Sequence, residues 1–174
     1  MTSVAAEIGY LLDYTEWDRA QWKAWFQTQG RDALLVDVGA NADTRITNVG
    51  ELVRHIFSAE QRYVDRIQEL PITDTSAVPA DDVERLFDFG RQTRERLRHL
   101  VDSFPAERWE LGRELTFGPH RRVITPKSML VQSVTHEIRH WAQLATLLRL
   151  VGRPTGAHDF LLSGVFERRL GLTS

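Results

Sequence analysis

The sequence predicts an all-α protein, an antiparallel four-helix bundle, on two observations. Four long amphipathic segments recur along the 174 residues, each with apolar side chains at helical spacing and with capping or helix-ending residues at its limits. Loops of short or medium length join them, which favours helices packed side by side. Hydrophobic residues make up 42% of the chain and charged residues 26%, as in an ordinary globular protein, so we expect one domain over residues 1–174.

The first two helices are expected at about residues 4–29 and 48–70. Gly30 follows the first helix at the usual C-terminal position. Asn48 and Glu51 have the spacing of an N-terminal capping box for the second, and Pro71 follows its end. The apolar stripes consist of Ile8, Leu11, Leu12, Trp22 and Phe26 in the first helix, and Leu52, Ile56, Ala59, Tyr63 and Ile67 in the second.

The third helix is expected at about residues 81–103, after a loop rich in Pro, Thr, Ser and Asp. Asp81 is its predicted N-cap. Residues 109–124 lack a helical period and centre on Gly118-Pro119, which predicts a short hairpin or an ordered loop.

Thr125-Pro126 then predicts a helix start, with an N-cap and a proline at the first helical position. This fourth helix is expected to end near Gly152. A short last helix over about residues 158–169 would cover one end of the bundle.

Composition excludes several classes of protein. The chain has no cysteine, so a metal site must use His, Asp or Glu. The net charge of -2 gives no basic surface for nucleic acid. No apolar run has the length of a membrane span, and the opening residues do not resemble a secretory signal. We therefore expect a cytoplasmic protein with no membrane or nucleic-acid partner.

Two histidines four residues apart carry the main chemical signal. His136 and His140 lie in the fourth helix, and side chains at this spacing share one helix face. Their helical neighbours include Ser133 and Leu144, so we expect both rings to point into the bundle. Two buried imidazoles need partners, and a divalent cation satisfies both, although backbone carbonyls or buried polar groups are the alternative.

A third ligand is expected from another helix, because a catalytic zinc usually has three protein ligands and a water. His55 lies at the edge of the second helix's apolar stripe and is the best candidate. His99, His120 and His158 fall in surroundings that favour surface exposure, with His120 or His158 a weaker candidate for substrate contact.

Glu137 makes the pair a formal His-Glu-x-x-His match, in which the glutamate of a metalloprotease is the general base. No downstream ligand or substrate-binding strand accompanies the match, so a protease is disfavoured. Glu137 is kept as a candidate catalytic base, with helix stabilisation as the alternative.

Three segments together resemble the DinB/YfiT-like superfamily of metal-dependent enzymes. They are residues 11–17 (LLDYTEW), residues 52–60 (LVRHIFSAE) with the first histidine, and the helix after Thr125-Pro126 with residues 136–143 (HEIRHWAQ). The family often has an Arg-Gly-Gln run at the last site, from which Arg139 and Trp141-Ala142 depart.

The resemblance implies an up-down-down-up bundle, a three-histidine zinc or nickel site and a homodimer. It also implies a small-molecule substrate, with a low-molecular-weight thiol as cofactor for S-transfer or isomerisation. If the metal activates water, the expected reaction is hydrolysis. Two other hypotheses are a non-catalytic bundle that binds a metal or small ligand, and a DNA-repair protein, which the charge balance disfavours.

Overall fold

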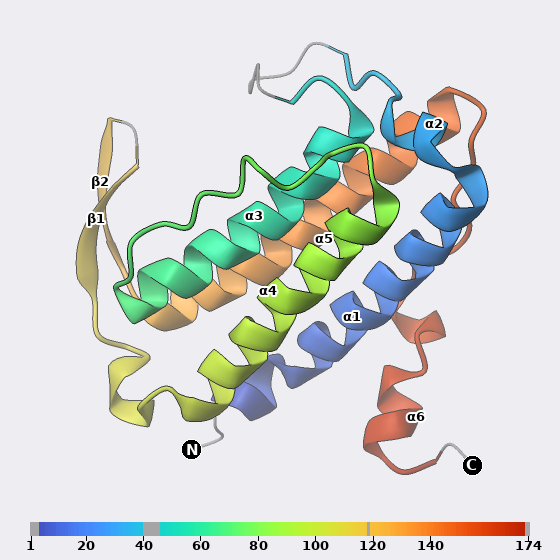
Figure 1. The fold of residues 1–174 in the computed structure, drawn as a ribbon. Helices are drawn as coiled ribbons and strands as arrows, with labels where there is room; N and C mark the ends of the chain where they lie inside the picture. Colours follow the sequence, from blue (N-terminus) through green and yellow to red (C-terminus); the bar gives the residue numbers. More distant parts are fainter. Residues whose placement is uncertain (1–3, 40–45, 118, 173–174) are drawn as a thin grey trace.

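The structure, a computed structural model, describes residues 4–39, 46–117 and 119–172 (Figure 1). It confirms the predicted four-helix bundle with a small hairpin before the last long helix. The long helices are α1 (Val4–Gln29), α3 (Val49–Gln68), α4 (Val83–Ser103) and α5 (Pro126–Leu150).

The four helices run up, down, down and up (Figure 1). α3 packs against α4 and α5, and α1 packs against the same two helices from the other side. Because α3 and α4 are parallel, residues 69–82 must cross the length of the bundle to join them. Within the described ranges, no helix is both long enough and apolar enough to cross a membrane.

The helices begin at the capping residues that the sequence predicts, except that the N-cap of α4 is one residue later than predicted. The Asn48 side chain accepts a hydrogen bond from the Glu51 amide, and Thr125 forms a capping box with Ser128. Asp82, and not the predicted Asp81, caps α4 by accepting from the amide of Arg85. These side chains satisfy amides that the helix itself leaves without partners.

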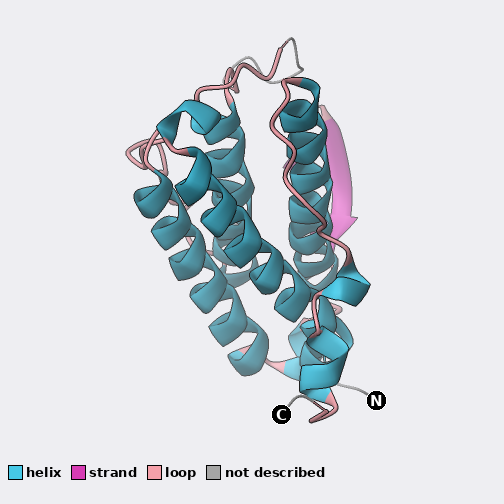
Figure 2. Cartoon of the chain, turned by 90° about the vertical axis from the view of Figure 1, so that its right-hand side faces the viewer, coloured by secondary structure: helices cyan, strands magenta, loops and turns pink. Residues whose placement is uncertain are grey.

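Two connections differ in detail from the prediction. A short helix, α2 (Arg31–Leu34), follows Gly30 and buries Ala33 and Leu34 against the core. The expected last helix is divided into η2 (Phe160–Leu162) and α6 (Val165–Arg169), because Gly164 adopts a left-handed conformation with φ of 66° between them. Figure 2 shows this C-terminal segment running along the bundle to α6, which contacts α1.

The insert before α5 is a short turn, η1 (Ala106–Arg108), and an antiparallel hairpin. Its strands are β1 (Arg113–Phe117) and β2 (His120–Ile124), as the Gly118-Pro119 pattern predicts, although Gly118 lies outside the described residues. The hairpin extends from the end of the bundle where α5 begins (Figure 1).

The core consists of two apolar clusters, one toward each end of the bundle. The cluster near α2 contains Trp22, Phe26, Phe57, Leu86 and Trp141 among others. The cluster near the hairpin contains Leu12, Ile67, Leu97, Leu100 and Leu130 among others. Along each long helix, a charged residue lies between the residues of the two clusters.

These four charged residues form a buried layer across the middle of the bundle, one from each long helix. Arg19 donates to Glu60 and to Glu137, at 2.8 and 2.6 Å, and Arg94 donates to the same two carboxylates, at 2.8 and 2.7 Å. Each side chain is at most 8% exposed. Two arginines and two glutamates balance in charge, and such pairing is required when charges are buried.

The layer also fixes how the helices approach one another. Gly90 of α4 lies against the ring of Phe57, where a β-carbon would come within 2.8 Å of ring carbons. Its carbonyl accepts a hydrogen bond from Arg19 at 2.8 Å. Arg94 lies in an arginine-rich stretch of α4, but it is only 3% exposed and is neutralised by Glu60 and Glu137.

Candidate metal centre

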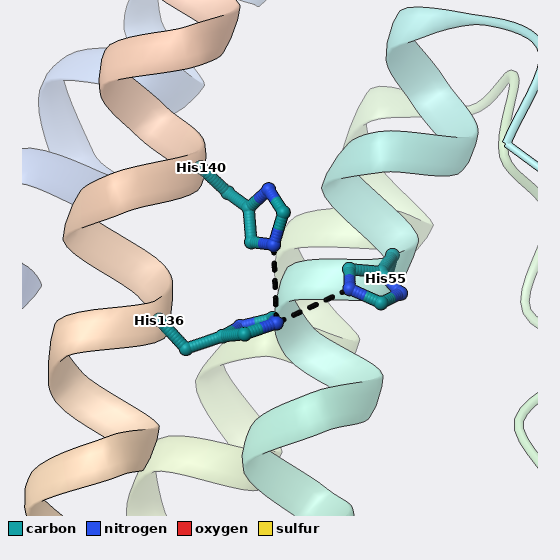
Figure 3. A group of neighbouring side chains, drawn as sticks. All are labelled: His55, His136 and His140. Atoms are coloured by element: carbon teal, nitrogen blue, oxygen red, sulfur yellow. Dashed lines mark hydrogen bonds between the residues drawn. The ribbon is translucent and has the colours of Figure 1, made fainter. Parts of the chain in front are cut away.

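Three histidines from two helices meet at the seam between α3 and α5 (Figure 3). The Nε2 atom of His136 lies 3.2 Å from that of His55 and 3.1 Å from that of His140. Each residue offers one nitrogen to a group whose atoms lie within 4.8 Å of one another. The predicted triad is therefore assembled in the folded chain.

The spacing of these nitrogens fits a shared cation. Zinc binds imidazole nitrogen at about 2.0–2.1 Å, so two ligands of a tetrahedral ion lie roughly 3.3 Å apart. The two measured separations, 3.2 and 3.1 Å, are close to that value. Three neutral imidazoles are also a donor set that zinc and nickel accept. The residues present thus fit the divalent ion that the sequence predicts.

The three rings are half-buried, and they lie at the helix seam instead of in the bundle interior. The interior face of α5 is formed by Val134, Glu137 and Trp141, about a quarter-turn around the helix from the histidines. The expectation that both rings point inward therefore needs correction. A site at the seam can be reached from solvent.

Burial favours the neutral form of His136 and His140. It is the largest cause that lowers the pKa of His136, to about 3, with further contributions from His140, His55, Arg62 and Arg139. Burial also lowers the pKa of His140, against a hydrogen bond to Gln143 that raises it. A neutral ring has a free lone pair for a metal, whereas a protonated ring has none.

Gln143 orients one of the three rings. The Nδ1 atom of His140 donates to the Oε1 atom of Gln143 at 2.7 Å, which places the ring proton on Nδ1 and leaves the Nε2 lone pair facing His136. The Nδ1 atom of His136 is buried and has no hydrogen-bond partner among the described residues. The position of the His136 ring is thus set by packing and by the convergence of the three Nε2 atoms.

A cavity of about 710 Å³ adjoins the cluster. His55 and His140 form part of its wall, with Arg139, Gln143 and Thr146 as further polar residues. The remaining wall is apolar and comes from both helices and from the loop before α3: Val38, Ile46, Leu52, Ala142 and Leu147. This volume is typical of a site for a small molecule.

Glu137, the candidate base, belongs to the buried charged layer. Its Oε1 atom accepts from Arg19 at 2.6 Å and from the indole of Trp141 at 3.1 Å. Its Oε2 atom accepts from Arg19 and Arg94, at 2.8 and 2.7 Å. The side chain is 2% exposed, so both oxygens are occupied inside the bundle.

The three histidines outside the cluster lie in different settings. His99 and His120 are exposed, as expected. His158 was also expected at the surface, but it stacks on the indole of Trp22 and bonds to the buried Asp18 at 2.6 Å. None of the three joins the metal-ligand group found among the described residues.

Sequence reasoning missed the charged layer, although a signal was present. Arg19, Glu60 and Arg94 each occupy an apolar-stripe position, for example Arg19 between Thr15 and Trp22. Together with Glu137 they place one charged residue on the inward stripe of each long helix, with a total charge of zero, and this pattern indicates a buried ion network.

The fold and the cluster together define a helical-bundle protein with three histidines that can hold a metal ion. The sequence pattern described as the DinB superfamily matches residues 12–144. Because this match covers most of the chain, the protein belongs to the DinB superfamily, as the three sequence segments predicted. No curated protein matches the chain.

Proposed function

We propose that the protein is a metal-dependent enzyme that acts on a small molecule in the cavity beside the three histidines. The observation that carries the proposal is the convergence of three Nε2 atoms, from three histidines of which His55 and His140 line that cavity. Among the described residues the group gathers three donors and not four. Three protein ligands are the pattern of catalytic zinc sites, whereas structural sites have four.

A divalent ion bound here would supply Lewis acidity, which lowers the pKa of a water or thiol at its open coordination position. With a low-molecular-weight thiol the reaction is S-transfer or isomerisation, and with water it is hydrolysis. We favour zinc or nickel, because both bind imidazole nitrogen.

The chain's own residues bind and orient the reactants. Gln143 holds His140 in the tautomer whose Nε2 atom is free to bind a metal. Leu52 and Leu147 on facing helices form part of the apolar side of the cavity. A substrate with an apolar body would therefore be held with its polar end toward the histidines.

Glu137 fits a positioning role better than that of a base. To accept a proton from substrate it would have to leave Arg19 and Arg94, which hold both of its oxygens. By joining α5 to α1 and α4, it fixes the rotation of the helix that carries His136 and His140. We therefore propose that Glu137 sets the geometry of the cluster from inside the bundle.

The test is metal content and affinity of the purified protein beside two variants. We expect the wild type to bind about one zinc per chain. His136→Ala should lose it at unchanged helicity, while His120→Ala, which removes an exposed histidine outside the cluster, should retain it. Equal metal content in wild type and His136→Ala would defeat the proposal.

A metal-loaded sample is then screened with thiols and electrophiles, and with hydrolysable esters and amides. Turnover that His136→Ala lacks and His120→Ala retains would identify the reaction class. A tightly bound metal with a fourth protein ligand and no exchangeable water would support the non-catalytic alternative. The homodimer, the absence of a nucleic-acid partner and the cytoplasmic location stay predictions, and light scattering tests the first.

A further inference from the structure

The cavity beside the histidines contains a charge that the proposed metal chemistry does not use. Arg139 of α5 forms part of its wall, next to His140 in sequence and one helical turn from His136. Its guanidinium has no hydrogen bond or ion pair to any other residue in the described ranges. An arginine that lines a cavity without a carboxylate partner has its donors available to a ligand.

Arginines elsewhere in the protein are generally paired. Arg98 bonds to both Asp13 and Glu16, and Arg91 bonds to Asp88 and Glu95. The buried arginines are held by the glutamates of the charged layer. Arg139 is one of several arginines in the described ranges without such a pair, and it is the one among them that lines the cavity beside the histidines.

Among the described residues that line the cavity, none is acidic and Arg139 is the one permanently charged group. A divalent ion on the histidines would add further positive charge. A positive charge in the wall of a cavity favours negatively charged ligands. Its apolar wall, with Val38, Ile46, Leu52 and Leu147, favours a hydrocarbon body.

We propose that the substrate of this site is a small organic anion, whose carboxylate is bound by the guanidinium of Arg139 while its apolar body lies against Leu52 and Leu147. This inference rests on the proposed function and adds the substrate class to it. A guanidinium binds a carboxylate through two parallel hydrogen bonds, so it would fix the orientation of the ligand as well as its charge. The reacting atom would then lie on the histidine side of the cavity.

Arg62 of α3 provides a matched control. Its side chain too has no hydrogen bond or ion pair in the described part of the chain, and its charge, like that of Arg139, contributes to the lowered pKa of His136. Both arginines are thus near the cluster, but Arg62 does not line the cavity. Removing either one takes away one positive charge near the cluster, and of the two only Arg139 lines the cavity.

The experiment is an NMR titration of zinc-loaded protein with hexanoate and with its neutral analogue hexanamide. We expect hexanoate to bind more tightly and to shift the amide resonances of Gln143 and Thr146, which line the cavity. Arg139→Gln should weaken hexanoate binding about tenfold, the effect of losing a charged hydrogen bond. Arg62→Gln should change it by about twofold or less, through unscreened charge alone.

Equal binding of the acid and the amide, or equal losses in Arg139→Gln and Arg62→Gln, would overturn the inference. Shifts confined to residues outside the cavity would do the same. Zinc content is measured in every sample, so a failure of the metal site is seen separately. If wild type binds no zinc, the same titration of the metal-free protein still decides whether Arg139 selects the anion.

Discussion

The carboxylate of Glu137 accepts a hydrogen bond from Arg94 of α4 at 2.7 Å, across the centre of the bundle. Its neighbour in sequence, His136, faces the seam between α3 and α5. One turn of α5 thus contributes to two polar sites, a charged layer inside the bundle and a histidine cluster at its surface. Because both sites depend on the rotation of α5, the layer and the cluster should respond together to mutation.

Replacing Glu137 by Gln should destabilise the protein by about 3–5 kcal/mol, because it leaves two buried arginines with one carboxylate between them. Urea unfolding followed by circular dichroism measures the loss. Glu95→Gln is the control, since Glu95 pairs with Arg91 on an exposed surface and should have little effect. Equal stability of Glu137→Gln and wild type would show that the charged layer does not hold the helices.

Replacing Gln143 by Ala should weaken metal binding about 10–100-fold, the usual effect of removing a hydrogen-bond partner of a ligating histidine. Stability without metal should be unchanged, because Gln143 is exposed. Competition with a chromophoric chelator gives the affinity. Gln132→Ala, an exposed position on the same helix, is the matched control and should bind metal like wild type.

The metal-free protein should lose stability as the pH falls below about 6.5, the pKa of an unfolded histidine. The pKa of His136 in the folded protein is lowered to about 3, so between these values the unfolded chain binds a proton that the folded chain does not. Thermal unfolding at several pH values from 7 to 4 measures how steeply the stability falls with pH. His136→Gln should flatten this dependence, while His120→Gln should leave it as in wild type.

His158 should have the opposite dependence. Its Nδ1 and Nε2 atoms donate to Asp18 and to the carbonyl of Thr155, which requires a protonated ring, and the Asp18 hydrogen bond raises its pKa. The protonated His158 ring therefore stabilises the folded protein fully below about pH 6.5. This contribution is lost as the pH rises through the raised pKa of His158 in the folded protein.

The measurement is the midpoint of thermal unfolding at pH 6 and pH 9, for wild type and His158→Gln. The difference between the two proteins should be larger at pH 6. Fluorescence of Trp22, which stacks on the ring, reports the same contact. A pH-independent difference would mean that His158 is held as a neutral ring.

The sequence by itself determined the features that depend on residues near one another in the chain. Apolar spacing and the caps at Asn48 and Thr125 predicted the long helices, because helix formation and capping are local. The four-residue spacing of His136 and His140 predicted a shared face for the same reason. The position of His55 at the edge of the second helix's apolar stripe made it the best candidate for a third ligand, and the segments that resemble the DinB superfamily include it.

Only the tertiary structure decided what lies between helices. It brought His55 to the other two rings, moved the cluster from the interior to the seam, and placed Glu137 among arginines from two other helices. It also joined His158, which local sequence had assigned to the surface, to the buried Asp18. Helical periodicity shows which residues share a stripe, but the direction of that stripe depends on how four helices pack, and packing joins residues far apart in the chain.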